Sequence, residues 1–123
     1  MSLPPSADTG RRGEQAAVDY LRRAGFVILE RNWRSGRYEL DIVARRWDEL
    51  HFVEVKTRRA DGLTTPEEAL THRKFAALRR AAAIYMAQRG VRLEPQFDLA
   101  AVDVAPDGAM TVRFAERAME CNW

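Results

Sequence analysis

The sequence is poor in the residues that carry thiol, zinc and membrane chemistry. Its single cysteine, Cys121, has no partner for an internal disulfide, and no Cys or His cluster surrounds it. Disulfide scaffolds and zinc sites are therefore not expected. No apolar run approaches the roughly 20 residues of a transmembrane helix, and the first residues lack the basic and apolar regions of a signal peptide. We therefore expect a cytoplasmic protein without membrane association.

Lysine is nearly absent, although the chain has many cations. Lys56 and Lys74 are the only lysines among 20 Lys and Arg residues, and 18 Asp and Glu residues leave a formal net charge of +2. This balance permits nucleic-acid binding without requiring it. The preference for arginine suits phosphate oxygens, but it is equally typical of a biased genome. The two rare lysines are therefore the more informative cations.

The size and composition are those of one globular domain. The chain has 123 residues, of which 46% are hydrophobic and 31% are charged. Residues 1–8, rich in Pro and Ser, are expected to form a flexible N-terminus. No repeat or linker divides residues 9–123, which we expect to fold as a single domain.

Hydrophobic periodicity predicts helices and strands in a clear order. The first helix is expected at about 10–24, and the second begins with a capping box at Thr65–Glu68 and ends by Gly90. The strands are expected at 26–31, 38–45, 50–57, 97–104 and 110–114. The helix between the third and fourth strands favours a parallel crossover, whereas the short turns favour antiparallel neighbours. The predicted fold class is α/β, a mixed sheet flanked by helices in the order α-β-β-β-α-β-β.

The second and third strands carry charged side chains among apolar ones. If their hairpin turns at residues 47–48, Asp41 lies opposite Glu54. The same register places Glu39 opposite Lys56 on the same face. The other face is then apolar and consists of Leu40, Ile42, Val53 and Val55. Opposed residues have Cβ atoms about 4.5–5.5 Å apart, a distance at which unpaired carboxylates repel each other.

A divalent cation between the two carboxylates would relieve this repulsion. Mg²⁺ takes oxygen ligands, usually one or two carboxylates together with substrate phosphates. An adjacent ammonium group adds the positive charge that phosphodiester hydrolysis requires. The alternative is a cross-strand salt-bridge cluster on a solvated face, which contributes only about 0–1 kcal/mol of stability.

Asp41, followed by Glu54-Val55-Lys56 on the next strand, resembles the PD-(D/E)XK signature of restriction-endonuclease-like nucleases, especially Holliday-junction resolvases. Over nearly the whole chain the sequence also resembles the YraN family of small bacterial proteins. The most specific block is Phe-Val-Glu-Val-Lys-Thr-Arg at 52–58. The chain departs from that family at Tyr38 and Gln96, where the family usually has Gly and Arg.

The resemblance implies a restriction-endonuclease-like fold with a metal site. Asp41 and Glu54 would bind Mg²⁺ or Mn²⁺ together with the Val55 carbonyl oxygen. Glu14, from the first helix, would complete the ligand shell directly or through water. Lys56 would orient or activate the attacking water. Without a metal, Glu14 is explained as a first-turn carboxylate that the helix dipole favours.

Other cations flank the proposed site and are candidates for binding nucleic-acid phosphates. They are Arg34, Arg37, Arg58 and Arg59, expected in loops, and Lys74, expected on the inward face of the second helix. The alternatives are ordinary surface arginines and, for Lys74, a side chain that snorkels from an amphipathic helix. His51 is expected on the other hairpin face without a catalytic role. Asp98 is expected to form structural hydrogen bonds.

Three functional hypotheses follow. The first is a metal-dependent endonuclease-like domain that hydrolyses DNA phosphodiesters, in branched or structured DNA by analogy with resolvases. The second is a non-catalytic nucleic-acid-binding module or adaptor that retains the nuclease fold. The third, a protein-interaction scaffold, predicts no affinity for DNA or Mg²⁺. Symmetric cleavage of two strands would also require a homodimer.

Overall fold

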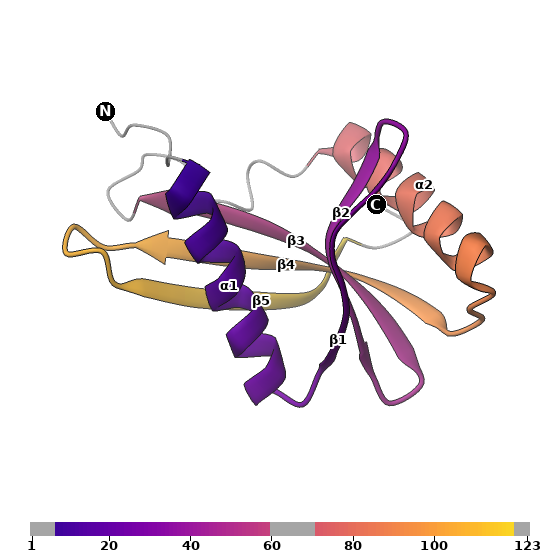
Figure 1. Cartoon of the computed structure of the whole chain (residues 1–123), viewed down its shortest axis with the longest axis horizontal. Coiled ribbons are helices and arrows are strands. Elements are labelled where there is room, and N and C mark those ends of the chain that lie inside the picture. The colour runs from indigo at the N-terminus through magenta and orange to yellow at the C-terminus, as the bar shows by residue number, and fades with distance from the viewer. Residues whose placement is uncertain (1–6, 60–70, 120–123) are drawn as a thin grey trace.

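The computed structural model describes residues 7–59 and 71–119. Helix α1 (Ala7–Arg23) leads into strands β1 (Val27–Ser35), β2 (Tyr38–Arg46) and β3 (Glu49–Arg59). Helix α2 (His72–Arg89) precedes strands β4 (Glu94–Val104) and β5 (Met110–Met119) (Figure 1). The predicted α/β class and element order are therefore confirmed. Helix α1 begins inside the segment 1–8 that the sequence predicts to be flexible.

The strands form one sheet in the order β1-β2-β3-β4-β5. Strands β3 and β4 run parallel, and the other neighbouring pairs are antiparallel. The parallel pair is the predicted crossover, because α2 lies between β3 and β4 in the chain. The β2–β3 turn is Trp47-Asp48, and the pairs Ile42–Val53 and Val43–Phe52 have the register expected from the sequence.

The two helices pack against opposite faces of the sheet, as the two core clusters show (Figure 1). Consecutive strand residues point to opposite faces. Ile42 and Val53 therefore join the core under α1, whereas Val43 and Phe52 join the core under α2. Neither helix of the described ranges is long and apolar enough to cross a membrane.

Helix α2 begins later than the sequence predicts. Thr71 is extended, and its hydroxyl accepts a hydrogen bond from the Lys74 N–H at 3.1 Å, which makes Thr71 the N-cap. The capping box predicted at Thr65–Glu68 lies outside the described residues. The prediction of a helix that continues without a break from Thr65 is wrong, because Thr71 is extended and α2 begins after it. The predicted end at Gly90 is confirmed, since Gly90 has a left-handed φ of 64°.

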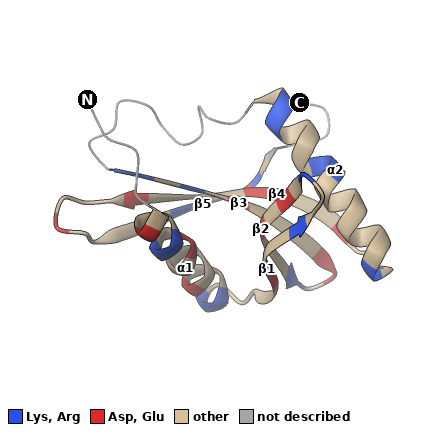
Figure 2. Ribbon diagram, turned by 45° about the horizontal axis from the view of Figure 1, so that its top comes forward, with Lys and Arg blue, Asp and Glu red and all other residues tan. Residues whose placement is uncertain are grey.

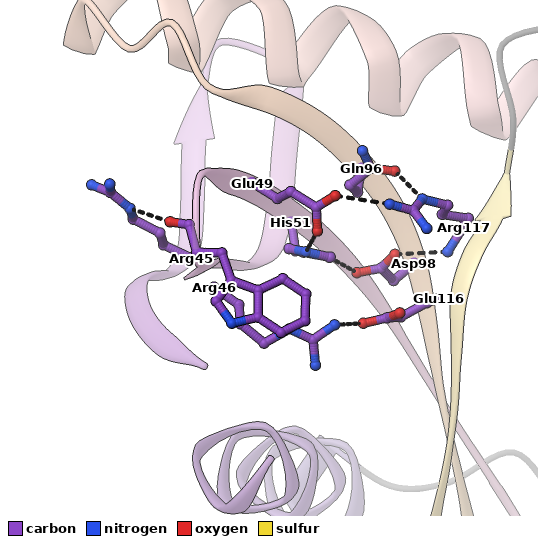
Figure 3. A network of polar contacts seen from close by, with 9 residues as sticks. Arg45, Arg46, Glu49, His51, Gln96, Asp98, Glu116 and Arg117 are labelled. Atoms are coloured by element: carbon purple, nitrogen blue, oxygen red, sulfur yellow. Dashed lines mark hydrogen bonds and ion pairs between the residues drawn. The ribbon is translucent and has the colours of Figure 1, made fainter. Parts of the chain in front are cut away.

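A buried polar network joins β3, β4 and β5 close to the β2–β3 turn (Figure 3). His51 Nδ1 lies 2.6 Å from the Asp98 carboxylate, and His51 Nε2 lies 3.2 Å from Glu49. Asp98 also accepts the Arg117 N–H at 2.9 Å, and the Arg117 guanidinium donates to Glu49 and Gln96. Burial lowers the pKa of His51, but the two carboxylates outweigh burial and raise it. Asp98 thus forms the structural hydrogen bonds expected of it.

The close packing of α1 against the sheet depends on Gly13. A Cβ atom at this position would lie 2.2 Å from the Thr57 hydroxyl oxygen and 3.1 Å from the Thr57 Cβ. Only a residue without a side chain allows the helix to approach β3 this closely. Because Glu14 is the next residue, the same contact sets where Glu14 lies relative to the sheet.

We expect Gly13→Ala to lower the free energy of unfolding by about 1–3 kcal/mol, because the added methyl group overlaps Thr57. Gly10→Ala is the matched control, since nothing lies within 4 Å of a Cβ at that position. The control should be neutral or should stabilise the helix by about 0.5–1 kcal/mol. Urea unfolding followed by circular dichroism measures both variants. Equal effects of the two substitutions would contradict the packing argument.

Candidate functional site

Strands β2 and β3 separate at Asp41 and Glu54, a point that we call the strand fork. Backbone pairing runs from the turn to the pair Ile42–Val53 and stops there. Beyond it, β3 continues beside β4 while the β1–β2 hairpin reaches toward α2 (Figure 1). The Val55 N–H donates to Asp41 Oδ2 at 2.8 Å. A side-chain carboxylate thus accepts the backbone hydrogen bond where the strands diverge.

The carboxyl group of Asp41 lies among other carboxylates. Burial is the main cause that raises its pKa from 3.8 to about 7. The charge of Glu54 adds to this rise, and the charges of Glu14 and Glu39 add smaller contributions. The hydrogen bond from the Val55 N–H acts in the opposite direction. A cation beside Asp41 would favour its ionised form.

Lys56 lies next to Glu54 on the same face of β3. Its Nζ is 3.4 Å from Glu54 Oε1, and only 29% and 25% of the two side chains are exposed. Burial lowers the pKa of Lys56, but a hydrogen bond with Lys74 and the neighbouring carboxylates raise it overall. The pKa of Lys74 is lowered by its hydrogen bond with Lys56 and by burial. The two lysines therefore share one site, in which the pKa of Lys56 is raised and that of Lys74 is lowered.

A cavity of about 280 Å³ opens between the β1–β2 turn and α2. It is lined by Arg37, Tyr38, Glu39, Glu54, Lys56, Lys74, Ala77 and Leu78. The structure therefore brings Glu54 and both lysines to the wall of one cavity. Asp41 is not part of that wall, and its bond to the Val55 N–H holds it at the strand fork.

The separation of the strands changes the placement of three residues predicted from simple alternation. Glu39 forms an ion pair with Arg34 at 3.1 Å, and strand pairing ends before Glu39 can lie opposite Lys56. Leu40 packs in the core under α2, not on the opposite face as predicted. Tyr38 lines the cavity, although alternation predicts that it points away from the carboxylates. Alternation between the two strands is reliable only where β2 is paired with β3.

Glu14 is held by two side chains of β1. Its Oε1 accepts from Asn32 Nδ2 at 3.0 Å and from Arg31 Nε at 3.3 Å, and 15% of its side chain is exposed. Its charge raises the pKa of Asp41, so the two carboxylates interact electrostatically. Sequence reasoning missed both partners of Glu14. Asn32 was the residue in the sequence that could have indicated this contact, because asparagine is disfavoured within strands. In the structure Asn32 adopts a left-handed φ of 52°.

The cations predicted to bind nucleic acid fall into two groups. Arg37 and Lys74 line the cavity. Arg34 and Arg58 are ion-paired with carboxylates of the chain, at 3.1 and 3.2 Å. Arg34, Arg58 and the exposed Arg59 lie in strands, not in loops as predicted. Within the described ranges, Arg37, Lys74 and Arg59 form no such ion pair.

Besides the predicted Lys74, α2 carries cations that the sequence did not single out. The first half of the helix carries Arg73, Lys74, Arg79 and Arg80, and the helix has no acidic residue. Figure 2 shows blue segments but no red ones on α2, whereas α1 carries both colours. Within residues 7–59 and 71–119, none of these four cations forms an ion pair with Asp or Glu. Their charge is therefore available to an external anion.

The donor set at the strand fork suits a hard cation. Asp41 and Glu54 offer carboxylate oxygens, the ligands that Mg²⁺ and Mn²⁺ prefer. In the part of the chain that the structure describes, no three His, Cys, Asp or Glu side chains group closely enough to hold a metal ion. A cation at the fork would therefore take two carboxylates from the protein and its other ligands from water or substrate, as Mg²⁺ commonly does.

Comparison with known proteins identifies the family. Residues 13–102 match the model of Uncharacterised protein family UPF0102, the YraN family. The chain belongs to this family. It is 40% identical over 114 residues to a UPF0102 protein of Symbiobacterium thermophilum, which covers 92% of this chain and 97% of that protein. A UPF0102 protein of Syntrophotalea carbinolica is 48% identical over 106 residues, or 85% of this chain and 86% of that protein.

Some UPF0102 proteins are longer than this chain. The UPF0102 protein of Oleidesulfovibrio alaskensis is 46% identical over 102 residues, which cover 82% of this chain and 50% of that protein. This chain thus spans about half the length of that relative. The segment that matches the UPF0102 model contains Glu14, the strand fork, and both lysines. The family resemblance seen in the sequence is confirmed.

The pKa of Asp41 predicts a pH-dependent stability in metal-free buffer. Between about pH 4 and pH 7 the folded protein holds a proton at Asp41 that the unfolded chain has lost, so the free energy of unfolding falls as the pH rises. Asp41→Asn keeps an acceptor oxygen for the Val55 N–H and carries no charge. At about pH 8 this variant should be more stable than the wild type by about 1–4 kcal/mol, and at about pH 4 the difference should be small.

Urea unfolding in EDTA at both pH values measures this difference. Asp48→Asn, at an exposed carboxylate in the β2–β3 turn, is the control and should change stability by less than about 0.5 kcal/mol. A difference between the wild type and Asp41→Asn that stays constant with pH would show that Asp41 does not titrate in this range.

Proposed function

We propose that this protein is a metal-dependent, endonuclease-like enzyme that hydrolyses DNA phosphodiester bonds. The observation that carries the proposal is the grouping of Asp41, Glu54 and Lys56 at the strand fork, beside a cavity that opens toward α2. Two carboxylates and an ammonium group are what metal-assisted phosphodiester hydrolysis requires. The resemblance to PD-(D/E)XK nucleases supports the same chemistry.

In this proposal Asp41 and Glu54 hold Mg²⁺ or Mn²⁺ together with the Val55 carbonyl oxygen. The metal supplies Lewis-acid stabilisation of the phosphate and lowers the pKa of bound water. The bond from the Val55 N–H to Asp41 Oδ2 orients the carboxylate and leaves Oδ1 for a ligand. Glu14 completes the ligand shell directly or through water, since its Oε1 accepts two hydrogen bonds from β1 side chains and its Oε2 remains for a ligand.

Lys56 is the group proposed to neutralise the reacting phosphate. Its Nζ lies at the cavity wall, 3.4 Å from Glu54 Oε1. From there it would orient the attacking water or stabilise the charge that develops on the phosphate. Lys74 would reach the same phosphate from α2, because it lines the same cavity.

The cations of α2 support a nucleic acid as the substrate. Side chains of Arg and Lys that lack carboxylate partners bind phosphate oxygens and release counterions from nucleic acid. Branched or structured DNA follows from the resemblance to resolvases. Symmetric cleavage of such DNA would use two copies of the chain.

A non-catalytic nucleic-acid-binding adaptor is the second candidate. The observation in its favour is that, over the described ranges, no three potential ligands are grouped to hold a metal. The cationic half of α2 could bind DNA without any metal. The adaptor and the enzyme therefore differ in metal binding and cleavage, and share DNA binding.

Metal binding can be measured without catalysis. We expect Mn²⁺, at about 100 times its Kd and at about pH 8, to raise the Tm of the wild type by about 5–10 °C. Asp41→Asn and Glu54→Gln should show little shift, because each removes a charged ligand. Glu94→Gln, at an exposed carboxylate where β4 begins, is the control and should respond like the wild type. Equal shifts in all variants would mean that the metal binds elsewhere.

Cleavage is tested on duplex, single-stranded, flap and four-way-junction DNA in Mg²⁺ or Mn²⁺. The wild type should cut at least one substrate, and Glu54→Ala and Lys56→Ala should each lose about 100-fold or more in rate. Arg23→Ala, which removes an exposed cation from α1, should keep the rate of the wild type. Salt-sensitive DNA binding without cleavage by any form would favour the adaptor.

A further inference from the structure

A second hollow, of about 310 Å³, adjoins the cavity along α2. It is lined by Arg37, Tyr38, Ala76, Ala77 and Arg80. Arg37, Tyr38 and Ala77 also line the cavity, so the two hollows lie side by side between the β1–β2 turn and α2. Among the described residues, no carboxylate lines this second hollow. Its lining is cationic, aromatic and small.

Two guanidinium groups converge on the Tyr38 hydroxyl in this hollow. Arg37 Nη2 donates to Tyr38 Oη at 3.2 Å, and the Arg37 guanidinium lies 5.2 Å from the centre of the Tyr38 ring. Arg80 of α2 lines the same hollow, and Arg37 and Arg80 together lower the pKa of Tyr38. A guanidinium carries five N–H donors. One shared hydroxyl oxygen therefore leaves most donors of both arginines available.

Neither Arg37 nor Arg80 has a carboxylate partner within the described ranges. Elsewhere in the same ranges many arginines do, as Arg58 does with Asp103 at 3.2 Å. Two like charges that meet at one neutral hydroxyl repel each other, and an anion between them would remove that repulsion. An oxyanion with several acceptor oxygens suits two planar guanidinium groups best.

We infer that Arg37, Tyr38 and Arg80 form a binding site for a phosphodiester group of a nucleic-acid strand, adjacent to the phosphodiester that reacts at the strand fork. This inference rests on the proposed function and deepens it. Glu54 and Lys56 line one hollow and Arg80 lines the adjacent one, so one strand would place successive phosphates in the two hollows. The alanines of α2 leave room for the strand close to the helix backbone. The substrate class is thus a single nucleic-acid strand that follows α2.

The test measures binding in EDTA, where cleavage does not occur. A fluorescein-labelled single-stranded DNA oligonucleotide is titrated with the full chain at several salt concentrations, and fluorescence anisotropy gives Kd. Arg37→Gln and Arg80→Gln should each raise Kd roughly three- to tenfold and reduce the slope of log Kd against log salt by about 0.7. Arg23→Gln, which removes one exposed cation from α1, should change Kd less than about twofold.

Tyr38→Phe distinguishes the contribution of the hydroxyl to binding from that of the arginine charges. The variant keeps the ring beside Arg37 and removes the oxygen that both guanidinium groups share. We expect Kd to rise roughly two- to fivefold, with the salt slope unchanged because no charge is lost. Circular dichroism of each variant verifies that the fold is retained.

Two outcomes would overturn the inference. One is a Kd for Arg37→Gln and Arg80→Gln equal to that of Arg23→Gln. The other is displacement of the oligonucleotide by an equal concentration of inorganic phosphate, which would indicate a site for free phosphate. Failure of the proposed hydrolysis is a separate result, because a wild type that never cuts DNA would still show these binding differences. Unchanged binding by the arginine variants, alongside cleavage by the wild type, would refute this site alone.

Discussion

The hydrogen bond from the Val55 N–H to the Asp41 carboxylate determines the rest of the candidate site. In an antiparallel pair this N–H would be bound by a carbonyl of the neighbouring strand. Here the carboxylate accepts it at 2.8 Å, so β2 leaves β3 without an unsatisfied backbone donor. The β1–β2 hairpin can then reach α2. The same separation opens the space between Glu54 and Lys74, which continuous strand pairing would close.

The sheet uses its polar groups in two different ways. At the end near the β2–β3 turn, the pairing of β4 with β5 is irregular between Phe97 and Leu99. Asp98 fills this irregularity by accepting the Arg117 N–H, and it also binds the buried His51. These groups satisfy one another and stabilise the fold. At the strand fork, burial and the neighbouring carboxylates raise the pKa of Asp41, and an external cation would stabilise its ionised form.

Local patterns predicted the parts of the structure that local contacts determine. Alternation gave the register of the β2–β3 turn and grouped Glu54 with Lys56 on one face of β3, and chain order predicted the parallel crossover. The separation of β2 from β3 depends on packing against α2, far along the chain, and alternation therefore misplaced Leu40. Asp103, which pairs with Arg58, is 45 residues away in sequence, so no local pattern predicts this ion pair. The capping-box pattern drew the prediction to Thr65 and passed over Thr71, although threonine is a good N-cap residue at either position.

The absence of carboxylates from α2 gives the nearly neutral protein a separation of charge. The whole chain carries a formal charge of only +2, yet four cations gather in the first half of this helix. In the field of a polyanion such as the proposed substrate, this distribution would exert a torque that turns α2 toward the polyanion. Screening limits this torque to a range of about 8 Å at physiological ionic strength. The charge pattern would therefore affect the orientation of the final encounter more than the frequency of distant collisions.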